Sequence, residues 1–167
     1  MIFVTVGTHE QQFDRLVKFV DELKKKDVIK EDVIIQIGFS NYIPMNCRWQ
    51  RLFPYTEMLE LVDKASIVIT HGGPSSFIMP LQVGKTPIVV PRRKEFGEHV
   101  NDHQVMFCHA VEEKQRNIVV IDDIKDLTNA IVNYNDIVLN KSANLNSNNM
   151  KFCERFEKEI CELFKSK

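Results

Sequence analysis

The sequence predicts an α/β protein built on a Rossmann-like, doubly wound parallel sheet. Three observations support this prediction. Short, continuous runs of apolar and β-branched residues recur along the 167-residue chain, as strands buried on both faces require. Segments with apolar residues at helical spacing separate these runs, so strands and helices alternate. Glycine-containing turns directly follow several runs, at the edge where parallel sheets bind ligands.

The expected elements follow in this order. Residues 2–6 form a strand that stops at Gly7, and residues 13–26 form a helix. Further strands are expected at 33–37, 49–53, 67–70, 87–90 and 118–121, with helices at 57–65 and 124–134. Pro74 opens another helix, which Pro80 is expected to kink or shorten because a proline past the first turn removes a hydrogen bond.

The chain is expected to hold one main domain, over residues 1–139. Residues 140–149 are rich in Asn and Ser and are expected to form a linker. Residues 150–167 form a C-terminal amphipathic helix in this prediction, with an apolar stripe of Phe152, Phe156, Ile160, Leu163 and Phe164. That stripe either docks on the domain or provides a surface for a partner.

Composition excludes several classes of protein. The net charge of −1 gives no general attraction to nucleic acid or acidic lipid, so no nucleic-acid partner is expected. No apolar run reaches the roughly 20 residues that cross a bilayer. The first residues lack the basic lead of a signal peptide, and the four cysteines form no C-x-x-C pair. We therefore expect a cytosolic protein with buried or idle thiols.

The tripeptide Gly84-Lys85-Thr86 resembles the end of an ATP-binding loop. The pattern G-x-x-x-x-G-K-[ST] requires a glycine at position 79, which is Met79, and a helix after the threonine, where this sequence predicts a strand. We interpret Gly84 as a glycine that ends a helix, with Lys85 as a cation near that end. The dinucleotide pattern G-x-G-x-x-G is also absent from the sequence.

The segment His71-Gly72-Gly73-Pro74-Ser75-Ser76 is the main candidate site. Glycines let main-chain N–H groups approach a ligand, and the start of a helix favours phosphate. The alternative is a tight strand-to-helix turn capped by serine. Gly7-Thr8-His9 is a second turn after a strand, and two such turns at one sheet edge favour a diphosphate between them.

The polar stretch 91–104 also follows a predicted strand. His99 and His103 are four residues apart, but no third ligand is evident, and no Asp-x-Asp pair is present to hold a divalent ion. We expect no metal and no cofactor. The alternative for this stretch is a solvated loop.

Two stretches carry a resemblance to a known family. MIFVTVGTHEQQFDRL and ITHGGPSSFIMPLQVGKTPIVVPRRKEFGEHVNDHQ resemble the C-terminal, donor-binding half of GT-B glycosyltransferases of family 28. The likeness extends over about residues 1–128. It is strongest to small bacterial polysaccharide-biosynthesis transferases such as capsular β-1,4-galactosyltransferase catalytic subunits.

The resemblance implies roles for individual residues. It places the donor diphosphate on His71, Gly72, Gly73, Ser75 and Ser76, with Gly7 and Thr8 in the same cleft. It places the donor sugar near Asn101, Asp102, His103 and Gln104, and Arg92 or Arg93 beside the departing UDP. His9 and Glu98 are candidates for the catalytic base, which could instead lie on another protein. Many relatives bind the ribose with an acidic residue where this chain has Met79.

The resemblance also implies half of an enzyme. The expected activity is inverting, metal-independent transfer from a UDP-sugar to a lipid-linked saccharide in capsular or exopolysaccharide synthesis. UDP-galactose is the first choice of donor, and UDP-N-acetylglucosamine and UDP-glucuronate are the alternatives. A membrane-anchored acceptor-binding subunit would hold this chain at the inner face of the plasma membrane, in part through the C-terminal helix. The alternatives are a non-catalytic scaffold or activator of a partner enzyme, and an epimerase, which would need the missing dinucleotide pattern.

Overall fold

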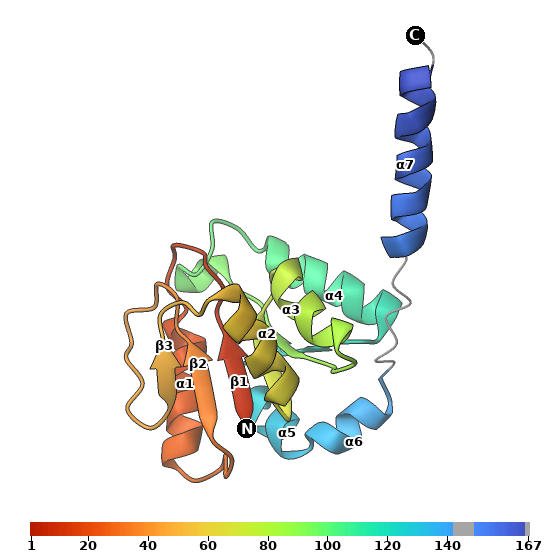
Figure 1. Ribbon diagram of the computed structural model, residues 1–167. Coiled ribbons are helices and arrows are strands. Elements are labelled where there is room, and N and C mark those ends of the chain that lie inside the picture. The colour runs from red at the N-terminus through yellow and green to blue at the C-terminus, as the bar shows by residue number, and fades with distance from the viewer. Residues whose placement is uncertain (142–148, 166–167) are drawn as a thin grey trace.

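The computed structural model of the protein describes residues 1–141 and 149–165 (Figure 1). The strands are β1 (Ile2–Thr5), β2 (Val33–Gln36), β3 (Arg48–Gln50), β4 (Ile67–His71), β5 (Ile88–Val90) and β6 (Val119–Val120). The helices are α1 (Asp14–Lys25), α2 (Tyr55–Lys64), α3 (Pro74–Gln82), the 3₁₀ turn η1 (Lys94–Phe96), α4 (His103–Gln115), α5 (Asp126–Val132), α6 (Tyr134–Leu139) and α7 (Asn149–Lys165).

The strands of the described chain form one sheet in the order β3-β2-β1-β4-β5-β6. Every neighbouring pair is parallel. This is the strand order of a doubly wound Rossmann sheet, in which the chain winds outwards from the centre in both directions. The predicted fold class is therefore confirmed.

Helices cover both faces of the sheet because successive strand residues point to opposite sides. Ile2 and Val4 pack in a buried cluster with residues of α1 and α5, whereas Phe3 packs in another cluster with Val62 of α2. A third cluster joins residues of α3 and α4 to β5. Figure 1 shows α2 and α3 lying in front of the sheet.

Most expected elements agree with the observed ones to within two residues at each end, but two differ more. The third strand ends at Gln50 instead of residue 53, because the chain turns there into α2. The helix expected at 124–134 is two short helices that meet at Asn133. Helix α3 contains the buried Pro80 and runs only two residues beyond it.

A buried carboxylate fixes the loop that leads to β3. Asp21 of α1 is 1% exposed and accepts hydrogen bonds from Tyr42 Oη (2.8 Å), Met45 N (3.1 Å), Asn46 N (2.7 Å) and Asn46 Nδ2 (3.1 Å). Burial alone would raise the pKa of Asp21, but these hydrogen bonds to the ionised form lower it below its usual value. The loop is therefore held against α1 by a carboxylate that stays charged.

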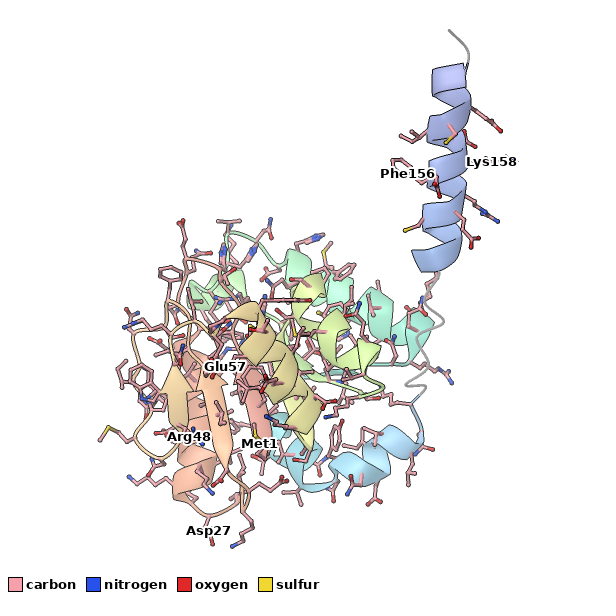
Figure 2. All side chains as sticks on the ribbon, in the orientation of Figure 1. Met1, Asp27, Arg48, Glu57, Phe156 and Lys158 are labelled. Atoms are coloured by element: carbon pink, nitrogen blue, oxygen red, sulfur yellow. The ribbon has the colours of Figure 1, made fainter. Side chains whose placement is uncertain are left out.

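Helix α7 stands apart from the sheet domain in Figure 1. Phe156 and Lys158 project from opposite sides of it (Figure 2), and Phe156 and Ile160 are exposed. The expected linker falls largely on residues 142–148, outside the described residues, so the division into domain, linker and helix stays a prediction. No helix within the described residues is long and apolar enough to cross a membrane.

Candidate functional site

The candidate site lies where β1 and β4 end. These central strands pair in register, with Thr5 opposite Thr70, so Gly7 and the His71-Gly72-Gly73 turn follow at the same edge of the sheet. Because all strands are parallel, this is the carboxyl edge, where α/β sheets bind ligands. The structure thus brings the two expected turns together.

The imidazole of His71 lies between two glycines. A Cβ atom added at Gly7 would come 2.4 Å from His71 Cε1, and one added at Gly73 would come 2.4 Å from His71 Nε2. Gly7 also has a positive φ of 75°, which side chains rarely adopt. Gly73 has φ −79°, so space alone requires glycine there. The His71 ring therefore requires the lack of a side chain at both positions.

His71 is a neutral, buried imidazole. The residue is 7% exposed, and among the described residues its buried Nδ1 has no hydrogen-bond partner of normal geometry. Burial, and next the positive charge of Arg92, lower the pKa of His71 to about 3. At neutral pH the ring therefore presents one N–H donor and one acceptor nitrogen, without charge.

Helix α3 begins directly after the second turn. Gly73 is its N-cap, Pro74 its first residue, and no side chain caps its first amides. Pro74 fits this place because it lacks the N–H that the first turn leaves unpaired. The serine-capped alternative therefore does not describe this turn. The uncapped N-terminus carries partial positive charge and favours an anion.

A cavity of about 270 Å³ opens beside this helix start. It is lined by residues of the two turns and of α2 and α3, with one residue from β2: Thr8, His9, Gln36, Tyr55, Met58, His71, Ser75, Ser76 and Met79. The lining thus combines polar side chains with those of a tyrosine and two methionines. No carboxylate is among these lining residues. Met79 lines the cavity, at the position where many relatives are expected to carry an acidic residue that binds the ribose.

Gln36 is a lining residue that the sequence reasoning missed. It is 1% exposed, its Nε2 donates to Thr5 Oγ1 (3.0 Å), and its Oε1 accepts from Phe53 N (3.0 Å). Thr5 Oγ1 also accepts from Gly7 N (3.1 Å). Gln36 therefore connects the first turn to the segment that starts α2. The feature of the sequence that could have indicated this role is a polar residue at the last position of a buried strand.

A larger cavity, of about 360 Å³, lies between α1 and the segment before α5. Its two arginines, Arg15 and Arg93, are ion-paired with Glu98 and Asp122. The cavity at His71 is therefore the better candidate for an anion, because no side chain of the described residues caps the amides of the helix start there.

Comparison with known proteins identifies the family. The glycosyltransferase family 28 C-terminal domain matches residues 1–163. The chain belongs to this family. UDP-N-acetylglucosamine transferase subunit ALG13 of Homo sapiens is 33% identical over 107 residues, which cover 59% of this chain and 9% of that protein.

Two solved structures share the fold of this family 28 domain. The glycotransferase of kitacinnamycin has a TM-score of 0.56 at 18% identity, over 78% of this chain and 34% of that one. The spinosyn forosaminyltransferase SpnP has a TM-score of 0.55 at 15% identity, over 83% of this chain and 36% of that one. The chain therefore spans about a third of the length of these glycosyltransferases.

Arg92 and Gln104 of the family 28 domain lie behind the turns and do not line the cavity. Arg92 is fully buried and donates to main-chain carbonyls only. Gln104 Oε1 accepts from both Gly72 N (3.1 Å) and Arg92 N (3.1 Å). Beneath Gly72, Cys108 Sγ would come 2.8 Å from an added Cβ. These residues position the second turn. Arg92 and Gln104 were expected to contact the donor, but neither lines the cavity.

The other residues expected near the donor sugar are exposed at the start of α4. Asn101 Oδ1 accepts from His103 N (3.1 Å), and Asp102 Oδ1 accepts from Lys94 N (2.9 Å). The His103 ring stacks on Phe107, with centroids 6.1 Å apart. The structure does not bring these three side chains to the cavity, and their contact with a sugar stays a prediction.

The two candidates for the catalytic base differ in accessibility. His9 lines the cavity, with Nε2 2.8 Å from Gln11 Oε1 and its ring stacked 4.9 Å from that of His99. Glu98 is fully buried, bound by Arg15 through two hydrogen bonds and by Arg93 N (3.0 Å). The structure contradicts the expectation for Glu98, because a buried, ion-paired carboxylate cannot reach a substrate hydroxyl. His9 stays a candidate.

Lys85 belongs to the Gly-Lys-Thr tripeptide that resembles the end of an ATP-binding loop. In the structure its role is to stabilise the fold. Gly84 ends α3 with φ 74°, and Lys85 Nζ donates to the last carbonyls of α2, on Val62 (2.8 Å), Asp63 and Ala65 (2.7 Å). The cation therefore stabilises the end of a neighbouring helix instead of its own. Among the described residues, no group of three His, Cys, Asp or Glu side chains is placed to hold a metal ion.

Proposed function

We propose that this chain is the catalytic, donor-binding subunit of a two-component glycosyltransferase that uses a UDP-sugar. One observation carries the proposal: two glycine turns, an uncapped helix start and a neutral buried histidine meet at one cavity of about 270 Å³. The diphosphate would lie against the first amides of α3 and the hydroxyls of Ser75 and Ser76, with Gly7 and Thr8 opposite.

The nucleoside would occupy the side of the cavity formed by α2 and α3. Tyr55, Met58 and Met79 offer apolar surface for a planar base, and Gln36 is a polar residue of the same lining. Because no carboxylate lines this side, the ribose hydroxyls would be bound by neutral groups or left to solvent. This arrangement supports a nucleotide held mainly through its diphosphate.

The proposed reaction is inverting and needs no metal. Breaking the bond from the sugar to UDP places negative charge on the departing diphosphate. Helix-start amides that point at this diphosphate stabilise the transition state more than the ground state. His9 is the candidate base in this chain for the acceptor hydroxyl, and a base on the partner is the alternative.

A partner would supply the acceptor-binding half. The chain spans about a third of the solved glycosyltransferases with this fold. Large apolar side chains are exposed after the carboxyl ends of several strands, at Phe39, Leu52, Tyr55 and Phe96, and on α7 at Phe156 and Ile160. We propose that these surfaces contact a membrane-anchored subunit, which holds the chain at the inner face of the plasma membrane.

We further propose galactose as the transferred sugar and a lipid-linked saccharide as the acceptor, in capsular or exopolysaccharide synthesis. This part rests on the resemblance to small bacterial transferases. The alternative function is a non-catalytic scaffold or activator of a partner enzyme, and the absence of a carboxylate from the cavity lining favours it.

Calorimetry with UDP, UDP-galactose and UDP-N-acetylglucosamine tests the proposal. We expect binding of UDP and the UDP-sugars by the chain alone, and sugar transfer only when the partner and its lipid-linked acceptor are present. The Gly73→Val variant distinguishes a scaffold from a catalytic subunit, provided that the variant still forms the complex with the partner. If the chain is a scaffold, sugar transfer by this complex should be unchanged. Absence of UDP binding, both alone and in the complex, would contradict the transferase.

A further inference from the structure

Arg92 is the largest fully buried side chain of the domain. Its Nη1 donates to the carbonyls of Gln11 (2.9 Å), Gln12 (3.0 Å) and Glu98 (3.1 Å), and its Nη2 donates to that of Val6 (2.8 Å). Neutral carbonyls bind both Nη atoms without cancelling the charge, and Nε is buried with no hydrogen-bond partner among the described residues. Burying a charge in this way is unfavourable unless something offsets it.

The nearby carboxylate is already engaged by another cation. Glu98 forms two hydrogen bonds with Arg15, Oε1 to Nε (2.9 Å) and Oε2 to Nη2 (2.8 Å). Arg15, Glu98 and Arg92 together hold two positive charges and one negative charge. Arg92 and Glu98 are fully buried and the Arg15 side chain is 15% exposed, so this cluster carries a net positive charge that is largely shielded from solvent.

The cluster lies directly behind both turns of the cavity. The Val6 carbonyl that Arg92 binds precedes Gly7, and the Gln104 oxygen that holds Arg92 N also holds Gly72 N. A charge in the low-dielectric interior acts over a longer distance than one in water. After burial, Arg92 is the second cause of the lowered pKa of His71, which lines the cavity.

We propose that Arg92 is a positioning residue that also supplies a buried positive charge favouring a nucleoside diphosphate at the cavity, without touching it. This proposal rests on the proposed function, because it needs the diphosphate to bind at His71. The proposal predicts different effects on the two parts of the ligand. The buried charge of Arg92 favours binding of the diphosphate and does not affect binding of the nucleoside.

Affinities for UDP and for uridine, measured by calorimetry or by NMR titration, test the proposal. In Arg92→Met, UDP affinity should fall by about tenfold or more, while uridine affinity changes by less than about twofold. Arg92→Lys keeps the charge and should restore most of the difference between UDP and uridine. Lys18→Met removes an exposed charge from the same helix as Arg15 and should change neither affinity.

Arg15→Met keeps the proposal testable if Arg92→Met does not fold. It leaves the four carbonyl contacts of Arg92 in place but frees Glu98 to neutralise the guanidinium, so UDP should again weaken relative to uridine. Equal losses for UDP and uridine in the Arg92 variants, or a wild-type UDP-to-uridine ratio in Arg15→Met, would overturn the proposal. If the wild-type chain binds no UDP, the proposed function fails instead.

Discussion

Replacing Gly73 with alanine tests whether the His71 ring and the helix start form one binding unit. The backbone at Gly73 suits alanine, with φ −79°, so the change introduces no strain in the main chain. The new Cβ would lie 2.4 Å from His71 Nε2, against 3.4–4 Å for ordinary contact. The ring has little room on its other side, because the Gly7 backbone lies so close that even a Cβ there would come 2.4 Å from His71 Cε1.

The size of the effect follows from two opposing contributions. Overpacking a filled site costs about 1–3 kcal/mol. Alanine in a permitted conformation returns about 0.4–1 kcal/mol by restricting the unfolded chain. We expect a net loss of about 1–2 kcal/mol, or a Tm lower by about 5 °C for a domain of this size. Because the displaced ring enters the diphosphate site, UDP affinity should fall by about tenfold.

Gly84→Ala is the matched control. Gly84 has φ 74° and no atom within 4 Å of an added Cβ, so alanine is strained there without meeting a neighbour. Its Tm should fall by a similar amount, since this strain costs about 1 kcal/mol, while UDP affinity stays at the wild-type value. Thermal unfolding and calorimetry on both variants give the comparison. Wild-type UDP affinity in Gly73→Ala would refute the assignment of the diphosphate to this turn.

Further predictions concern stability, specificity and assembly. Lys85→Met should lower the free energy of unfolding by about 1–2 kcal/mol in a denaturant titration, because it uncaps α2, and should leave UDP affinity unchanged. Asp21→Asn should destabilise the domain at pH 7. Since the folded pKa of Asp21 is lowered, this difference should shrink as the pH falls below about 4, whereas a constant difference down to acid unfolding would contradict the lowered pKa. UDP and 2′-deoxy-UDP should bind within about threefold of each other, and Met79→Glu should widen that ratio in favour of UDP. Replacing Phe156 and Ile160 with aspartate should leave UDP affinity unchanged and reduce co-purification with the partner subunit; full co-purification would exclude α7 as the contact.

The fold could be predicted from the sequence because the sheet is parallel and buried. Apolar runs such as Ile2–Thr5 and Ile67–His71 have no amphipathic alternative, and the glycines after them mark their carboxyl ends. The weaker elements were less predictable. Strand β3 is exposed along its length, so its extent is set by pairing with β2 and not by its own hydrophobicity.

The two turns of the site were predictable for the same local reason. The cavity was not, because Gln36, Tyr55 and Met58 belong to segments that meet only after the sheet has formed. Their types carry no chemical motif. For Glu98 and Arg92 the sequence predicted contact with the substrate, and this prediction was wrong. Both are charged residues in a polar segment after a strand, yet the fold buries them. Position at the ligand edge predicts proximity to a site, but not the direction in which a side chain points.

The neutral state of His71 fits the proposed division of roles in the cavity. Burial and Arg92 keep the ring neutral in the ligand-free protein, with its pKa at about 3, so the proposed attraction for a diphosphate comes from fixed dipoles and from the buried charge of Arg92. Neither needs to reorganise when charge develops on the leaving group. If a carboxylate could replace His71 and retain UDP binding, this account of the cavity would be wrong, because both the dipoles and Arg92 favour negative charge on the ligand and a second anion would compete for them.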